Sequence, residues 1–190
     1  ADPEWRRRYR EAVLDTVRWP GAETNRVLVT PDRQRMFSLG LWSDPMLRQM
    51  DLSSQREVGA LYVGTLSWDM AHDPTRRRLL VPKFITCQVL VVDARTLTVQ
   101  ARWPAGFGAR TVRLDPELRL LYVGAMYAST VTVLDADSGA RLLRLRLGGH
   151  IKGLHLEPLT HKAYVGCDCG IFEIDGRKIR RGREESGARR

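Results

Sequence analysis

The side chains with the clearest capacity for chemistry lie near the C-terminal end of the chain, where Cys167 and Cys169 flank Asp168. Three histidines lie nearby in the sequence, at His150, His155 and His161. Thiolates and imidazoles bind zinc and other soft metals, but thiolate ligands usually have at least two residues between them. We therefore treat Cys167, Cys169 and His150 as weak metal candidates, interpret the cysteines as a loop pair, and expect no cofactor.

The rest of the sequence carries none of the usual catalytic signatures. It contains no serine nucleophile elbow, no phosphate-binding glycine loop and no paired-histidine metalloprotease helix. A redox dithiol of the thioredoxin type also needs two residues between its cysteines, so the pair Cys167 and Cys169 does not match it. This pattern favours a binding or scaffolding role over catalysis.

Two residue types recur at nearly constant intervals and define the elements that position these side chains. Prolines expected at the first turn of each unit are Pro31, Pro74, Pro116 and Pro158. Aspartates expected at the end of each third strand are Asp51, Asp93, Asp135 and Asp175. An interval of about 42 residues in a chain rich in strand-forming segments indicates a repeat of the propeller-blade type.

The hydrophobic pattern before each proline supports the same interpretation. The residues two and four positions before it are apolar in seven of eight cases, and His72 is the exception. Such alternation predicts a strand with one packed face, so His72 is interpreted as a packed side chain and not as a ligand. The aspartates are interpreted as turn residues whose carboxylates accept backbone N–H bonds.

The composition is that of a globular protein with its excess charge at the ends. The 190 residues are 43% hydrophobic, and no apolar run approaches the ~20 residues that a membrane-spanning helix needs. Of the formal net charge of +9, residues 177–190 contribute +5. We expect residues 181–190 to be a basic, disordered tail and residues 1–14 to form a short helix.

The third and fourth repeats resemble a known family. Leu121-Tyr122-Val123-Gly124 followed by Thr130–Asp135 is similar to the YVTN-type β-propeller repeat, and so is Tyr164-Val165-Gly166 followed by Ile171–Asp175. The likeness covers residues 15–180, although Gly-Ala and Gly-Cys stand where the family has Thr-Asn. It implies an all-β propeller of four-stranded antiparallel blades, related to lactonase-like propellers, and it favours an extracytoplasmic location.

About four blades are expected, over residues 22–64, 65–107, 108–149 and 150–180. The fourth strand of the last blade would be Lys178–Arg181, which is short and charged. Residues 15–20 resemble the segment around Trp103, two repeats later, and are predicted to be an outer strand without a blade of its own. The blades would form either a small closed ring completed by this strand or, as we favour, part of a larger propeller.

The candidate binding residues are those expected on one face of the propeller. Loops between second and third strands share this face with the connections between blades, and loops on a rigid scaffold commonly carry function. The candidates are Asn25, Trp42, Lys83, Arg110, Tyr127, His150 and Asp168, with Phe84 and the two cysteines nearby. Trp42 is expected to be an exposed aromatic side chain.

The function that follows is a non-catalytic β-propeller module that binds a protein or a small ligand or acts as a scaffold, with self-association or missing N-terminal blades as further expectations. One alternative is a metal-assisted hydrolase of the lactonase-like type, which needs acidic or histidine side chains around one ion. The other is binding of nucleic acid or another anionic surface through the arginine-rich ends, which would weaken steeply with salt. Nucleic acid is the less favoured partner.

Overall fold

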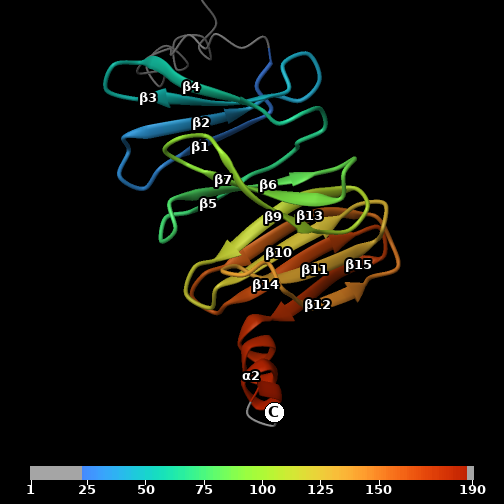
Figure 1. Ribbon diagram of the computed structural model, residues 1–190. Coiled ribbons are helices and arrows are strands. Elements are labelled where there is room, and N and C mark those ends of the chain that lie inside the picture. Colours follow the sequence, from blue (N-terminus) through green and yellow to red (C-terminus); the bar gives the residue numbers. More distant parts are fainter. Residues whose placement is uncertain (1–22, 188–190) are drawn as a thin grey trace, which may run out of the picture.

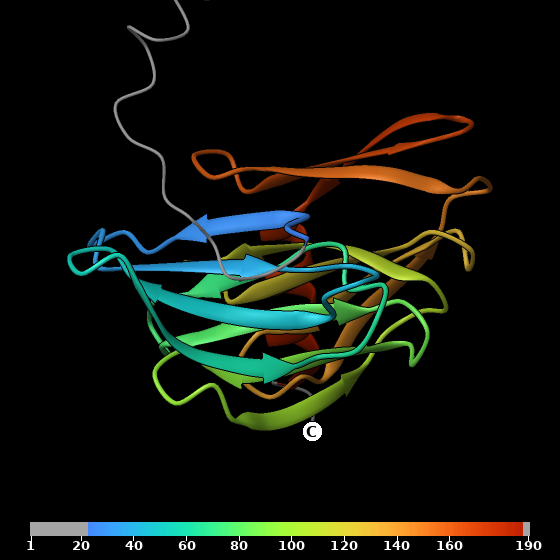
Figure 2. The ribbon, with the colours of Figure 1, turned by 90° about the horizontal axis from the view of Figure 1, so that it is seen from above.

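The computed structural model describes residues 23–187, in which the chain forms fifteen strands and one helix. The strands make four antiparallel sheets, and each sheet is built from one continuous stretch of chain. The sheets follow one another in chain order (Figure 1, and from above in Figure 2). The predictions for residues 1–14 and 15–20 lie outside the described residues.

Every strand pairs with the strand that follows it in its own sheet. The first sheet contains β1 (Arg26–Val29), β2 (Arg35–Leu39), β3 (Met46–Asp51) and β4 (Arg56–Tyr62). The second contains β5 (Ala71–Asp73), β6 (Arg78–Lys83), β7 (Gln88–Asp93) and β8 (Val99–Pro104). The third contains β9 (Ala109–Asp115), β10 (Leu120–Ala125), β11 (Thr130–Asp135) and β12 (Arg141–Arg146). The fourth contains β13 (Ile151–Glu157), β14 (Lys162–Cys167) and β15 (Gly170–Asp175). The all-β, blade-like architecture predicted from the repeat is therefore confirmed.

The aspartates at the ends of the third strands hold the turns that follow them. The Asp93 carboxylate accepts the backbone N–H groups of Arg95 and Thr96, each at 2.8 Å. Asp51 and Asp135 accept two backbone N–H groups each in the equivalent turns. The turn role predicted for these carboxylates is confirmed, and their recurrence is structural.

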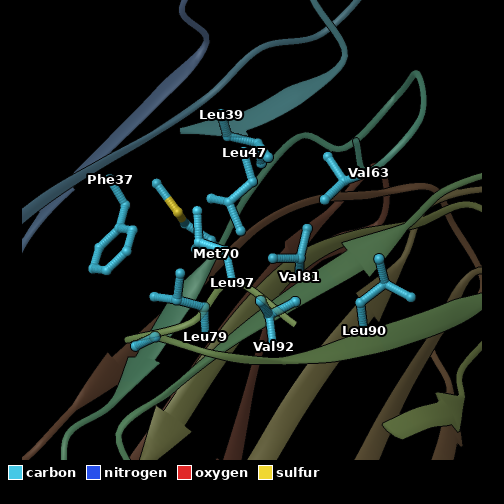
Figure 3. Packing of buried hydrophobic residues seen from close by; sticks show 11 residues of the cluster. Phe37, Leu39, Leu47, Val63, Met70, Leu79, Val81, Leu90, Val92 and Leu97 are labelled. Atoms are coloured by element: carbon cyan, nitrogen blue, oxygen red, sulfur yellow. The ribbon is translucent and has the colours of Figure 1, made fainter. Parts of the chain in front are cut away.

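Hydrophobic clusters fill the spaces between consecutive sheets. In the cluster between the first and second sheets, Phe37 and Leu39 of β2 pack with Leu79 and Val81 of β6 (Figure 3). Alternate residues of a strand point to opposite faces, so Leu80 of β6 packs instead in the cluster shared with the third sheet. Strands β6, β10 and β11 are consequently buried along their whole length.

The first and last sheets each have a face that no other sheet covers within the described part of the chain. Val27 and Val29 of β1 are both 48% exposed, whereas the equivalent Val112 of β9 is fully buried against the second sheet. At the other end of the stack, Ile171 of β15 is 79% exposed. Within residues 23–187, the four sheets are therefore part of a propeller whose first and last sheets each keep one uncovered face.

Helix α2 (Gly176–Gly187) stands where a fourth strand of the last sheet was expected over residues 178–181. The Asp175 carboxylate accepts the N–H groups of Arg177 and Lys178 at 2.9 and 3.4 Å, as an N-cap residue does. The segment lacks the alternation of apolar and polar residues that a half-buried strand needs. These features explain why the chain turns into a helix at this point.

Contacts with the third sheet hold the start of α2 in place. Ile179 packs against the cluster between the third and fourth sheets, and Arg180 Nη1 lies 3.1 Å from Asp135 Oδ2. Arg180 also donates to the backbone oxygen of Arg119 at 3.2 Å. The helix extends through Gly187, where disorder was expected from residue 181. One arginine of the basic segment is thus part of the fold.

Candidate binding surface

The loops emerge from two opposite edges of the stack, because consecutive strands run antiparallel. One edge, here called the loop edge, carries the loops between second and third strands together with the connections between sheets. The other, the turn edge, carries the turns after each first and third strand. The predicted binding residues all lie at or beside the loop edge, at strand ends or in its loops.

Four rings from successive loops form a row along the loop edge, here called the aromatic row. Tyr127 is central, since its ring lies edge-on to Phe84 with centroids 5.3 Å apart and stacks on Phe107 at 5.7 Å. The His150 imidazole lies edge-on to the same ring at 5.8 Å. Phe107 and Tyr127 are each more than half exposed. Contacts between the rings therefore fix the positions of exposed aromatic side chains that a binding partner can reach.

Two glycines explain how Phe107 comes to lie beside Tyr127. Gly108 has a φ of +78°, and a Cβ there would lie 2.9 Å from the backbone nitrogen of Tyr127. A Cβ on Gly106 would lie 2.7 Å from the Ala125 side chain. Only glycine combines this backbone conformation with this proximity, so the connection can lie tightly against the β10–β11 loop.

Charged side chains continue the row beyond His150. Its Nδ1 lies 3.0 Å from Asp168 Oδ2, and Asp168 Oδ1 lies 3.1 Å from Lys152 Nζ. The hydrogen bond from Lys152, together with those from His150, holds the pKa of Asp168 below its ordinary value. The carboxylate is therefore ionised at neutral pH, and it is exposed enough to accept a further hydrogen bond.

Asn25 and Arg110 meet at the connection between the first and second sheets. The Arg110 guanidinium lies 4.8 Å from the centroid of the Trp68 ring, a cation–π distance. Asn25 Nδ2 donates a 2.8 Å hydrogen bond to the Trp68 backbone oxygen. These two predicted binding residues are thus brought together around Trp68, where they tie loops of different sheets to one another.

Lys83 is buried, with only 5% of its surface exposed. Its ammonium donates to the Gly64 oxygen at 3.0 Å and to Ser67 Oγ at 2.7 Å. Burial lowers its pKa to about 8. Lys83 therefore holds the connection between the first and second sheets and is turned away from the surface that a ligand would contact.

Trp42 lies in the β2–β3 loop with 61% of its surface exposed, as expected of a loop aromatic side chain. Its backbone nitrogen donates a 2.6 Å hydrogen bond to Glu23 Oε2, and the Ser43 nitrogen donates to the same oxygen at 3.0 Å. The carboxylate thereby fixes the start of this loop. The indole remains available at the first-sheet end of the loop edge.

The cysteine pair forms a compact sulfur site at the β14–β15 turn. Cys167 Sγ lies 2.9 Å from Cys169 Sγ, and the Cys169 thiol donates to the Leu147 oxygen at 2.8 Å. The contact with Cys167 raises the pKa of the Cys169 thiol, which keeps it protonated. Within residues 23–187, no three His, Cys, Asp or Glu side chains are grouped so as to hold a metal ion.

Comparisons with known proteins give the fold class. Neither a family model nor a curated protein matches the chain. Among solved structures, it is similar to Kuenenia stuttgartiensis hydrazine synthase, with a TM-score of 0.74, 15% identity, and coverage of 88% of this chain and 50% of that one. It is also similar to U3-55K, with a TM-score of 0.72, 13% identity, and coverage of 85% and 51%.

A third similar structure is the dihydro-heme d1 dehydrogenase NirN in complex with DHE, with a TM-score of 0.67 and 19% identity over 80% of this chain and 34% of that one. These proteins share the β-propeller fold, so the chain is a β-propeller module. It spans about half the length, or less, of the structures it matches. In the described part of the chain, no helix has the length and apolarity needed to cross a membrane.

Phe107 was not among the predicted binding residues, although the repeat contains a signal for it. Phe84 and Tyr127 are 43 residues apart, and so are Phe107 and His150. The aromatic row therefore consists of two pairs of equivalent positions in consecutive repeats. A search for aromatic residues that recur at the repeat interval would have found all four members.

Proposed function

We propose that this chain is a non-catalytic binding module that recognises a protein partner through its loop edge. The observation that carries the proposal is the aromatic row, in which Phe107 and Tyr127 are 56% and 53% exposed yet ordered by contacts with neighbouring rings. Rigid aromatic anchors beside polar groups are typical of the residues that dominate binding energy at protein interfaces. Asp168 and Lys152 supply the neighbouring charges.

The repeat itself is proposed to be of the YVTN type. Tyr122 and Tyr164 occupy equivalent positions in β10 and β14, each followed by valine and glycine. Tyr122 is fully buried between the third and fourth sheets. The tyrosine thus supports packing between blades, which is consistent with a motif that serves the scaffold while the loops serve recognition.

Photo-crosslinking tests the binding proposal directly. Phe107 is replaced by p-benzoylphenylalanine in the full chain in its native host, and Leu159, which is 85% exposed in the β13–β14 turn, is replaced likewise as the control. We expect irradiation to give a discrete adduct of defined mass from position 107 that is lost in the Tyr127→Ala background. Equal adducts from both positions, or none from position 107, would contradict the proposal.

A further inference from the structure

The turn edge carries a repeated contact between consecutive sheets. In the last three sheets the first strand ends on an acid, namely Asp73, Asp115 or Glu157. Four residues later comes a cationic or titratable side chain with a left-handed backbone, namely Arg77, Arg119 or His161, with φ of 49°, 51° and 59°. The left-handed turn aims this second side chain at the sheet that precedes its own.

Two of the three boundaries between sheets are bridged in this way. The Arg119 guanidinium binds the fully buried Asp73 of the second sheet with two hydrogen bonds, of 3.0 and 2.7 Å. His161 Nδ1 lies 2.8 Å from Oδ2 of the buried Asp115 of the third sheet. We call each such contact a turn pair. A turn pair fills the space between two neighbouring turns with polar atoms that are hydrogen-bonded to each other.

The boundary between the first and second sheets has no turn pair, because Thr30 stands where the other sheets have an acid. Its hydroxyl stays within its own turn, 2.5 Å from Asp32 Oδ1 and 3.1 Å from the Arg35 nitrogen. Within residues 23–187, the Arg77 guanidinium has no hydrogen bond or ion pair. A crevice of about 390 Å³ lies between the two turns.

The crevice combines an apolar wall with an excess of positive charge. Phe37, itself 1% exposed, lines it together with Pro31 and Pro74. Arg77 contributes a guanidinium group without a hydrogen bond or ion pair in the described part of the chain. Arg95 contributes a second guanidinium group, which attracts the Asp93 carboxylate, and Asp32 contributes one carboxylate. Arg35 is already paired with Asp51.

His72 and Gln49 add polar groups without adding charge. Burial lowers the pKa of His72, so the imidazole is neutral at neutral pH. Gln49 is buried and donates through Nε2 to the Ala94 oxygen at 3.1 Å. The volume is that of an ordinary small-ligand site, in which mostly apolar walls meet a few placed polar groups.

We propose that this crevice binds a small carboxylic acid with an apolar body. Its carboxylate would stand in for the acid that Thr30 replaces and would pair with Arg77, while the body packs against Phe37. The Arg119–Asp73 turn pair, one repeat later, shows that an arginine at this turn position forms a two-bonded contact with a carboxylate. The site lies on the turn edge and is independent of the proposed protein-binding surface.

The test uses 2-naphthylacetate as the probe and its uncharged amide as the matched ligand, with binding to the full chain measured by titration calorimetry. We expect saturable binding of the carboxylate and at least about tenfold weaker binding of the amide, as for the loss of a charge-assisted hydrogen bond. Arg77→Gln should reduce carboxylate affinity to the level of the amide. Arg33→Gln, in the corresponding turn of the first sheet but outside the crevice, should leave it unchanged.

Thr30→Asp provides a second, gain-of-contact test. The new carboxylate should pair with Arg77, abolish binding of 2-naphthylacetate and raise the melting temperature. Equal affinities for acid and amide, full affinity in Arg77→Gln, or no saturable binding of the acid would each overturn the proposal. Arg77 is exposed, so its substitution does not threaten folding. The crosslinking result at position 107 bears only on the loop edge, so the two proposals fail separately.

Discussion

The boundary between the second and third sheets and the boundary between the first and second differ clearly at the turn edge. Both are filled by a hydrophobic cluster. The later boundary adds a buried network in which Arg78 and Arg119 both bind Asp73, whereas the earlier one has Thr30 and an open crevice. The comparison teaches that two blades can stack without a turn pair at their shared boundary. The polar contact at the turn can therefore be exchanged for a space that accepts a ligand.

Removing the buried acid should produce the largest difference between the two boundaries. Asp73→Ala leaves Arg78 and Arg119 without their shared carboxylate, which should lower the free energy of unfolding by about 3 kcal/mol or more. Thr30→Ala, at the equivalent position of the first sheet, removes only a hydroxyl and should cost no more than about 1 kcal/mol. Urea denaturation of both variants measures the difference. Equal losses would show that the two boundaries are held in the same way.

Alkaline pH should act on the earlier boundary through Lys83. Burial lowers its pKa from 10.5 to about 8 in the folded state, so between these values the unfolded chain binds more protons than the folded one. The free energy of unfolding should therefore rise from about pH 8 to about pH 10.5, by at most about 3.5 kcal/mol. Denaturation midpoints measured across this range give the slope.

The Lys83→Met variant isolates this contribution from that of other groups. Its stability should lack the part of the alkaline rise that belongs to Lys83, so the free energy of unfolding of the variant should fall relative to that of the wild type as the pH increases. The Arg–Asp network at the later boundary does not titrate in this range, because Arg119 stays charged and Asp73 stays ionised. A pH-independent difference between variant and wild type would argue against a buried, proton-releasing Lys83.

The smallest difference in stability is expected between two variants, each of which replaces an arginine at the same turn position of consecutive sheets. Arg119→Gln loses two hydrogen bonds to Asp73 and should destabilise the fold by about 1–2 kcal/mol. Arg77→Gln removes a side chain without such a partner in residues 23–187 and should change stability by less than about 0.5 kcal/mol. Thermal melts of the two variants, compared in the absence of ligand, measure this contrast. A larger loss for Arg77→Gln would reverse the comparison.

Local patterns made much of the fold predictable from sequence. The prolines and the strand-ending aspartates act within their own turns, so their interval of about 42 residues reports directly on the sheets. The alternation before Pro116 likewise predicted that Val112 would be buried. In contrast, the helix after Asp175 was predicted as a strand, because the repeat was extended into a segment that no longer carries its hydrophobic pattern.

Contacts between sheets were not predictable in the same way. Asp73 and Arg119 are 46 residues apart, and their pairing depends on the rotation from one sheet to the next and on the left-handed turn at Arg119. Lys83 was predicted at the ligand face, but the connection between sheets folds over it. Periodicity identifies equivalent residues, whereas packing between repeats decides which of them meet.

The turn pairs also give the stack a direction. Each one runs from the second side chain of one sheet to the acid of the sheet before it, so within residues 23–187 Glu157 of the last sheet has no following sheet to pair with. Glu157 instead accepts the N–H groups of Leu159 and Thr160 in its own turn. In evolutionary terms, a gene of this kind can gain or lose a unit of about 42 codons and every remaining sheet still meets a neighbour of the right polarity.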